Sequence, residues 1–277
     1  MGKRYFRLIG LALLSLIVLT ACGTKTPQTP NSSDVKNQTA TTRNQPKLRV
    51  AAAADLALAF KEIGDAFQAE TGIPVEITYG STGTAALQIE NGAPYDVFAA
   101  ADISFIDGLK KKGLTLPDTQ QLYAQGRIGL ATLKDSPLVL HSLNELADNP
   151  AVQKIAIADP SHAPYGRAAK QAFEHAGLWT KVQRKMVYSA NIQEALNMLK
   201  SKNVDVAILS LSLYRPDEVN FQLIDASWHE PLDQAITVLK GTKQEEKARR
   251  FIAFVNGAKG RLIMKKYGFL LPDETKP

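Results

Sequence analysis

The sequence is poor in the residues that build disulfides and side-chain metal centres. Its 277 residues contain one cysteine, and aromatic residues make up 7% of the chain. A single cysteine excludes an intramolecular disulfide and any metal site built from two or more thiolates. None of the four histidines forms a pair at i,i+4 spacing, so we expect no zinc site; they are His141, His162, His175 and His229.

The chain also lacks a large excess of charge of either sign. The formal net charge is +6, and three of the surplus positive charges (Lys3, Arg4 and Arg7) fall at the N-terminus. The charge of the remainder is too small for nucleic-acid binding, so no nucleic-acid partner is expected. The length and a hydrophobic fraction of 45% suit two lobes of about 100–150 residues or one large α/β unit.

The apolar run Leu8–Leu19 follows the basic N-terminus and is too short for a transmembrane helix, which needs roughly 20 apolar residues. It suits the core of a secretory signal. The run ends in Leu19-Thr20-Ala21-Cys22-Gly23, which resembles the bacterial lipobox, where the cysteine is lipidated and the chain is cut just before it. We therefore expect a lipoprotein signal peptide at 1–21 and a lipid anchor on Cys22. The alternative is a plain signal peptide or membrane anchor with an incidental cysteine.

Residues 22–47 consist mostly of Thr, Pro, Asn, Gln, Ser and Lys, with almost nothing apolar. Such a segment cannot bury enough surface to offset the entropy of ordering it. We expect it to be a flexible tether that holds a globular protein at the outer face of a membrane.

From Leu48 onward, short apolar runs alternate with amphipathic segments, and this order predicts parallel βαβ units in open α/β sheets flanked by helices. Helices are expected after Asp55, after the Gly80–Thr84 turn and after Asp102. The remaining predictions are strands at 48–53, 75–79, 96–100, 128–133, 154–158, 185–188, 204–209, 221–224 and 236–239, and helices at 167–176, at 192–199 and within 243–267. Ligands of such sheets bind at the carboxyl ends of the strands, beside helix N-termini.

Small and hydroxyl residues stand where several predicted strands lead into helices: Ala54-Asp55, Gly80–Gly83, Pro164–Gly166 and Asn191. A helix N-terminus has unpaired N–H donors and a partial positive charge, so several of them together could hold an anion without any Lys or Arg. Taken singly, each of these turns is better explained as an ordinary helix cap or turn than as part of a binding site. Gly80–Gly83 matches neither a phosphate-binding P-loop nor a nucleophile elbow.

Five strings occur in a set order: Val50–Leu56, Tyr79–Gly83, Gln88–Phe98, Asp159–Gly166 and Tyr267–Phe269. Together they resemble the substrate-binding proteins of bacterial molybdate ABC importers. The resemblance covers nearly everything from Leu48 to about Phe269, and the blocks beginning at Gln88 and Asp159 are its most specific parts.

The resemblance implies the two-lobe periplasmic-binding-protein fold of type 2, in which each lobe is an open sheet flanked by helices and two crossover strands join the lobes. The first lobe would comprise 48–125 and the returning segment 229–277. The second lobe would comprise 126–228. The chain would leave the first lobe near Gln125 and return near Trp228.

The resemblance also implies a tetrahedral dianion, molybdate or tungstate, held in the interlobe cleft by hydroxyls and backbone N–H groups. Metal would enter only as this oxyanion, with no protein side-chain metal ligand and no cofactor. The binding residues that the resemblance implies are Asp55, Ser81, Thr82, Tyr165, Ile192 and Ser210. Ala54 and Asn191 would support these residues without contacting the ligand themselves. Tyr165 and Ile192 would contribute backbone N–H groups. Ser210 stands where the family often has a tyrosine, so water would have room beside it.

Asp55 departs from the family pattern, in which serine, or asparagine in some members, is usual at this position. A carboxylate repels a dianion strongly in a dry cleft. We expect Asp55 to turn its carboxylate onto the second or third N–H of the helix as a cap and to offer only its own N–H, since Ser, Asn and Asp are near-equivalent caps. The alternative is a protonated oxyanion, such as hydrogen phosphate, whose O–H the carboxylate accepts.

The function implied is a monomeric, lipid-anchored solute receptor of a Gram-positive bacterium, not an enzyme, which passes its oxyanion to an ABC permease and its ATPase. Three alternatives stay open. The ligand could be phosphate, sulfate, chromate or a carboxylate. The chain could be an extracellular α/β hydrolase using Ser81, His162 and an Asp. It could also be a surface-interaction or sensory lipoprotein with a vestigial cleft.

Overall fold

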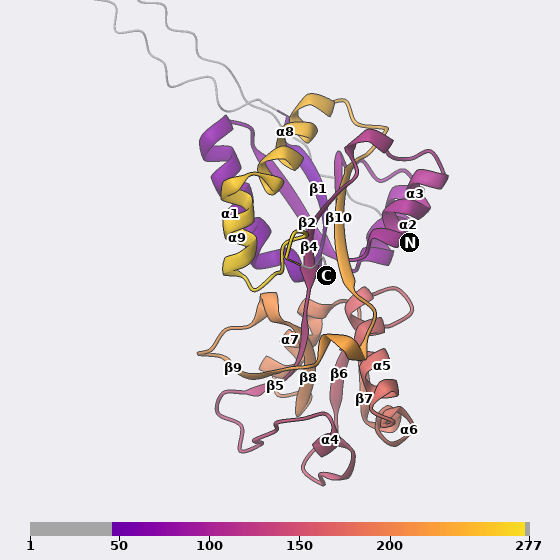
Figure 1. The fold of residues 1–277 in the computed structure, drawn as a ribbon, viewed down its shortest axis with the longest axis vertical. Coiled ribbons are helices and arrows are strands. Elements are labelled where there is room, and N and C mark those ends of the chain that lie inside the picture. The colour runs from indigo at the N-terminus through magenta and orange to yellow at the C-terminus, as the bar shows by residue number, and fades with distance from the viewer. Residues whose placement is uncertain (1–45, 275–277) are drawn as a thin grey trace, which may run out of the picture. The chain divides into compact units, whose positions relative to one another are not determined.

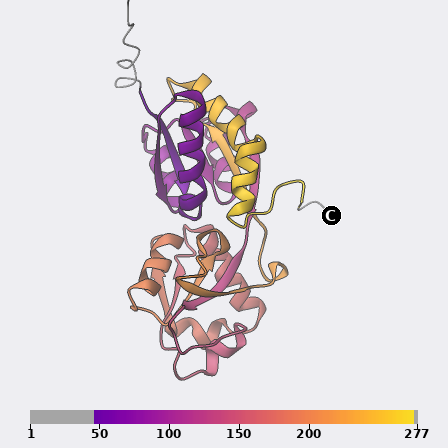
Figure 2. The same ribbon diagram turned by 90° about the vertical axis from the view of Figure 1, so that its left-hand side faces the viewer.

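The computed structural model describes residues 46–274, which form two lobes (Figures 1 and 2). The expected signal peptide at 1–21, Cys22 and nearly all of the expected tether lie outside the described residues. Within 46–274, no helix has the length and apolar character needed to cross a membrane.

The first lobe is built on a five-stranded sheet with the order β2-β1-β3-β10-β4. Its strands are β1 (Leu48–Ala53), β2 (Val75–Gly80), β3 (Val97–Ala100), β4 (Gln121–Gly126) and β10 (Leu232–Val238). β1 runs parallel to both β2 and β3, whereas β10 is antiparallel to β3 and β4. The carboxyl ends of β1, β2 and β3 therefore meet at one edge of the sheet.

The second lobe contains a five-stranded sheet with the order β7-β6-β8-β5-β9. Its strands are β5 (Ile128–Leu133), β6 (Ile155–Ala158), β7 (Met186–Ser189), β8 (Val206–Ser210) and β9 (Val219–Leu223). β6 is parallel to β7 and β8, and β5 is antiparallel to β8 and β9. Because these three strands are parallel, the carboxyl ends of β6, β7 and β8 also meet at one edge of their sheet.

Helices flank both sheets. Those of the first lobe are α1 (Ala57–Thr71), α2 (Thr82–Glu90), α3 (Ile103–Lys111), α8 (Glu245–Asn256) and α9 (Ala258–Lys266). Those of the second are α4 (Asn144–Asp148), α5 (Pro164–His175), α6 (Trp179–Val182) and α7 (Ile192–Lys200). In the first lobe, α2 and α3 share one apolar cluster with β1 and β10, while α1, α8 and α9 pack into another, so the two groups cover opposite faces of the sheet (Figure 1).

Aromatic packing closes the α1 and α8 side of the first lobe. Phe60, Phe67 and Phe251 are fully buried. The Phe251 ring meets Phe60 at 6.0 Å and Phe67 at 5.2 Å between centroids, both edge to face. This geometry suits the charge distribution of aromatic rings and adds about 0.5–1.5 kcal/mol per pair beyond burial. Helix α1 ends where the periodicity predicts, because Gly72 takes a φ of +71° that glycine adopts without strain.

Two chain crossings join the lobes. β4 lies in the first sheet and β5 in the second, so the chain passes between them at Arg127. The chain returns after β9 through the short 3-10 turn Ala226–Trp228 and enters β10. Glycine at 126 leaves room for the second lobe, because a Cβ there would lie 2.1 Å from the Tyr165 hydroxyl oxygen.

Most predicted elements are present, and the differences have local causes. The sequence pattern did not predict β4, and it predicted only the end of β10. Polar residues interrupt the apolar pattern of both strands: Gln121 and Gln125 in β4, and Gln234 in β10. The short helices α4 and α6 were also missed, since they hold too few residues to display a periodic pattern. The expected 243–267 helical region is two helices, α8 and α9, separated at Gly257.

Candidate anion site

A small cavity, with room for about one water molecule, lies where the carboxyl ends of strands from both lobes meet. The first lobe supplies residues that follow β1, β2 and β3, and the second supplies residues that follow β6 and β7. The lining residues are Ala53, Ala54, Asp55, Gly80, Ser81, Thr82, Ala101, Ala163, Pro164, Tyr165, Asn191 and Ile192. No Lys, Arg or His is among them.

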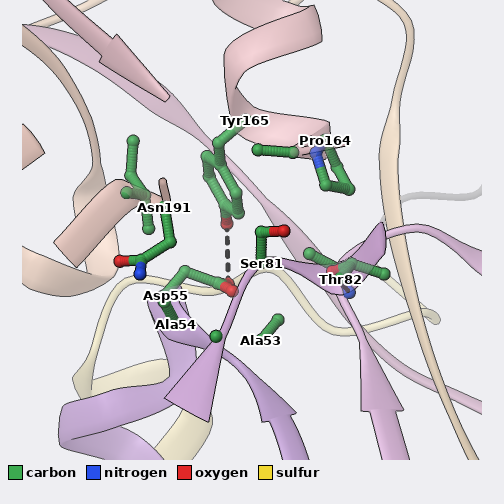
Figure 3. Close-up of a pocket in the computed structure, with 12 residues that line it drawn as sticks. Ala53, Ala54, Asp55, Ser81, Thr82, Pro164, Tyr165 and Asn191 are labelled. Carbon is green, nitrogen blue, oxygen red and sulfur yellow. Dashed lines mark hydrogen bonds between the residues drawn. The ribbon is translucent and has the colours of Figure 1, made fainter. Parts of the chain in front are cut away.

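Of the predicted binding residues, the structure brings together Asp55, Ser81, Thr82, Tyr165 and Ile192, with Ala54 and Asn191. Figure 3 shows Asp55, Ser81, Thr82 and Tyr165 around the cavity. Ser210 is not on the cavity wall. Its hydroxyl is buried and lies 2.6 Å from the Ser212 hydroxyl. The Ser212 hydroxyl in turn donates to the Asp55 carbonyl oxygen at 2.7 Å. Direct contact between Ser210 and a ligand therefore stays a prediction without geometric support.

The hydroxyls on the first-lobe side belong to the start of α2. Ser81 is the N-cap residue, and its Oγ accepts a hydrogen bond from the Thr84 N–H at 3.2 Å. Thr82 Oγ1 accepts from the Ala101 N–H at 3.1 Å. This bond orients Thr82 and leaves its own hydroxyl proton as a donor. Both side chains are buried, so they form a fixed part of the wall.

On the second-lobe side, two helix N-termini reach the cavity. Tyr165 is in the first turn of α5, and Ile192 begins α7 after the N-cap Asn191. The Asn191 side chain accepts from the N–H groups of Gln193 and Glu194, both at 3.0 Å. The first N–H groups of a helix have no intrahelical acceptor, so Tyr165 and Ile192 supply candidate donors of the predicted kind.

The expected capping role of Asp55 is wrong. Neither the 3-10 turn Ala54–Leu56 nor α1 has a side-chain cap at its start. Asp55 Oδ2 instead accepts hydrogen bonds from the Tyr165 hydroxyl at 2.9 Å and from Gln234 Nε2 at 2.7 Å. The carboxylate thus bonds to one side-chain donor from each lobe rather than to the N–H groups of the helix.

Burial governs the electrostatics of Asp55, which is 1% exposed. Desolvation raises the pKa of its carboxyl group to about 6, and the hydrogen bonds from Gln234 and Tyr165 only partly oppose that rise. Its Oδ1 is buried without a hydrogen-bond partner. The cavity therefore contains a carboxyl group that titrates near neutral pH and has one oxygen still unsatisfied.

Sequence reasoning missed the network behind Asp55. Gln234 Nε2 also lies 3.0 Å from the Tyr165 hydroxyl, and its Oε1 accepts from the Tyr123 hydroxyl at 2.8 Å. Tyr123 and Gln234 are both buried, and they come from β4 and β10. A glutamine inside a buried strand was the available signal, because a buried amide needs polar partners. For Tyr165, only a backbone role was expected.

Further contacts between the lobes surround the cavity mouth. His162 Nδ1 lies 2.8 Å from Ser81 Oγ, and the His162 carbonyl accepts from the Gly83 N–H at 2.9 Å. The Arg167 guanidinium pairs with the Asp102 carboxylate. A Cβ at Gly83 would lie 2.6 Å from the His162 oxygen, so this close approach requires glycine.

Ser81 and His162 are not part of a hydrogen-bonded Ser-His-acid triad in the described part of the chain. Among residues 46–274, the acid paired with His162 is Asp159, whose Oδ2 is 3.9 Å from His162 Nε2, which is too long for an orienting hydrogen bond. Within residues 46–274, no cluster of three or more His, Cys, Asp or Glu residues could hold a metal ion.

Residues 48–270 match the family model described as bacterial extracellular solute-binding protein. The chain belongs to this family. The match covers all the strands of both lobes, and the members of the family act outside the cytoplasm. The solute-binding protein is therefore extracytoplasmic.

Two curated relatives are informative. The molybdate-binding protein ModA of Azotobacter vinelandii is 30% identical over 80% of this chain and 89% of its own length. A Bacillus subtilis protein with the provisional name ABC transporter substrate-binding lipoprotein YvgL is 26% identical over 97% of this chain and 99% of its own. The solved structure of the Azotobacter vinelandii periplasmic molybdate-binding protein matches with a TM-score of 0.77 and 30% identity, covering 82% of this chain and 100% of that one.

These matches confirm the resemblance to ModA-like substrate-binding proteins that the sequence motifs indicated. They also confirm the fold class, with two lobes of mixed sheets flanked by helices as in type 2 binding proteins.

Proposed function

We propose that this solute-binding protein captures molybdate between its lobes and delivers it to the permease of an ABC importer. The observation that carries the proposal is the composition of the cavity wall. Hydroxyl and helix N-terminal donors from both lobes meet there, and no cationic side chain lines it. Neutral dipoles of this kind suit a tetrahedral oxyanion. The names of the relatives supply the choice of molybdate among such anions.

Binding would couple the ligand to lobe closure. Ser81 and Thr82 lie on one lobe and Tyr165 and Ile192 on the other, so only a closed arrangement offers all of these donors to one anion. A ligand that contacts both lobes shifts the population towards the closed form by its extra affinity for that form. The crossings at Arg127 and Ala226–Trp228 are the natural hinges.

We further propose that the protein acts without an enzymatic step and without a cofactor, as a monomer, and that it also accepts tungstate. Cys22 would carry the lipid that anchors it to the outer face of the membrane of a Gram-positive bacterium. Support for the anchor comes from the lipobox and from the similarity to the Bacillus subtilis protein, which extends over nearly the whole chain. Labelling cells with a fatty acid analogue tests it: wild type should incorporate label and Cys22→Ala should not.

Isothermal titration calorimetry of the full chain tests the ligand, with molybdate, tungstate, sulfate and phosphate titrated separately. Molybdate and tungstate should bind with one ion per chain, and sulfate and phosphate should bind at least tenfold more weakly. Thr82→Val should weaken molybdate binding, whereas Thr78→Val, an exposed position on β2, should not. Tight phosphate or sulfate binding with no heat from molybdate would contradict the proposal.

A further inference from the structure

Asp55 is the one acid on the wall of a cavity otherwise made of neutral donors and apolar groups. Its Oδ2 is fully engaged by Tyr165 and Gln234. Its Oδ1 is buried and has no hydrogen-bond partner. Leaving a buried charged acceptor unpaired is costly, so this oxygen requires either a donor from the ligand or a proton of its own.

A bare dianion supplies neither. Its oxygens are acceptors like Oδ1, and two negative groups in a desolvated cavity repel each other. A proton between Oδ1 and one anion oxygen removes the repulsion and satisfies the orphaned atom with one hydrogen bond. The same arrangement results whether the proton is drawn on the carboxyl or on the anion.

We propose that Asp55 couples anion binding to proton uptake, so that the protein binds its oxyanion together with one proton that lies between Asp55 Oδ1 and the ligand. The inference rests on the proposed function. The proton comes from solvent, one O–H bond forms on the shared pair, and no bond of the anion breaks. Asp55 thus sets specificity for anions that accept or carry a proton.

The titration range of Asp55 agrees with this role. Burial raises the pKa of Asp55 to about 6 before any anion enters. A nearby dianion raises the pKa of a carboxyl group further, because it favours the neutral form. The free protein is thus mostly deprotonated at Asp55 above pH 6 and takes up the proton as the ligand binds.

Few other groups near Asp55 can titrate in this range. The phenols Tyr123 and Tyr165, which face it from β4 and α5, have pKa values raised well above 10 by burial, and on β2 the pKa of Tyr79 is raised to about 12. The charged side chains of α1 are paired elsewhere, as in the Glu62 and Lys266 pair.

The other elements around Asp55 contribute little charge. The Glu194 carboxylate of α7 accepts from the Ala190 N–H. On β10, Asp233 accepts from Gln125. Arg167 of α5 pairs with Asp102, and the 3-10 turn Leu211–Leu213 has no ionisable residue. His162, next to Ser81, and Asp159, whose Oδ2 lies 3.9 Å from His162 Nε2, are the other ionisable pair near the mouth, so the experiment includes a His162 variant.

Calorimetry of the full chain with molybdate and tungstate from about pH 5.5 to about pH 8.5 tests the inference, using two buffers of different ionisation enthalpy at each pH. Wild type should take up close to one proton per anion at the alkaline end and little at the acid end. Its Kd should rise by up to about tenfold per pH unit above the pKa of Asp55.

Asp55→Asn keeps the shape and remains neutral at every pH. Its Kd for the anion should not vary with pH, and binding should take up no proton. At the alkaline end it should bind the anion at least about tenfold more tightly than wild type does. Asp55→Ser, which also lacks an ionisable carboxyl group, should lose the pH dependence as well. The matched controls His162→Gln and Asp233→Asn should retain the proton uptake of wild type.

Each contrary result has a distinct meaning. A wild-type Kd that is the same at all pH values, with no buffer-dependent heat, overturns the coupling and leaves the proposed function standing. Loss of uptake in His162→Gln but not in Asp55→Asn assigns the proton to the histidine and also overturns it. If neither anion binds at any pH, the proposed function itself has failed.

Discussion

Asp55 and Tyr165 belong to opposite lobes, and the tyrosine hydroxyl donates to the aspartate Oδ2 across 2.9 Å (Figure 3). The bond lies inside the cavity lined by helix N-termini, and both residues are buried. One contact therefore links three properties of the protein: the charge in the cavity, the stability of the fold and the closure of the lobes.

The first prediction concerns stability and pH. The pKa of Asp55 is raised from 3.8 to about 6 in the folded protein, so between these values the folded state binds more protons than the unfolded state. This contribution to stability is fully present below the pKa of Asp55 in the unfolded state. It is lost as the pH rises through the pKa of Asp55 in the folded state. Between about pH 4 and about pH 7.5 the loss amounts to about 2 kcal/mol.

Asp55→Asn cannot ionise and should not show this loss. Relative to wild type, its free energy of unfolding should therefore improve by about 2 kcal/mol between about pH 4 and about pH 7.5. Urea unfolding of both proteins without ligand, at the two pH values, measures the difference. A constant difference would mean that Asp55 has an ordinary pKa in the folded protein.

The second prediction concerns the phenol. Tyr165→Phe removes a donor that stabilises the charged carboxylate, so the pKa of Asp55 should rise further. The variant should lose about 1.5–3 kcal/mol of unfolding free energy at pH 7.5, the range for a hydrogen bond to a charged group. The loss should be smaller below pH 5, where Asp55 is neutral. Tyr95→Phe, which removes an exposed hydroxyl contact, should change stability little at either pH.

Those features of this site that depend on neighbouring residues in the chain could be predicted from the sequence. Cap and turn residues placed Ser81, Thr82 and Asn191 at helix starts, and the order of strands and helices placed those starts at the carboxyl ends of strands in the two sheets. The direction of the Asp55 side chain could not be predicted in this way. It depends on Tyr165 and Gln234, which lie 110 and 179 positions away in the sequence. The strands β4 and β10 were obscured for the same reason, since their polar residues serve a network rather than a local pattern.

The third prediction concerns the hydroxyl group that Thr82 contributes to the cavity wall. Thr82→Val preserves shape but removes the acceptor of the Ala101 N–H and the hydroxyl that we propose as a donor to the ligand. We expect the Kd for molybdate to rise at least tenfold, which corresponds to about 1.4 kcal/mol, within the range for one buried hydrogen bond. Calorimetry at fixed pH measures it. An unchanged Kd would remove Thr82 from the set of binding residues.

The last prediction separates closure from folding. Gly83 is in the first turn of α2, and its N–H donates to the His162 carbonyl of the other lobe at 2.9 Å. A Cβ at this position would lie 2.6 Å from that oxygen, and the three nearest atoms all belong to His162. Gly83→Ala should therefore obstruct lobe closure while leaving each lobe intact, since alanine favours a helix. We expect at least tenfold weaker molybdate binding and a larger radius of gyration by X-ray scattering with ligand present.

Gly108→Ala is the matched control, because Gly108 is also helical and a Cβ there would meet no atom within 4 Å. Equal binding and scattering by the two variants would show that the lobes close without this contact.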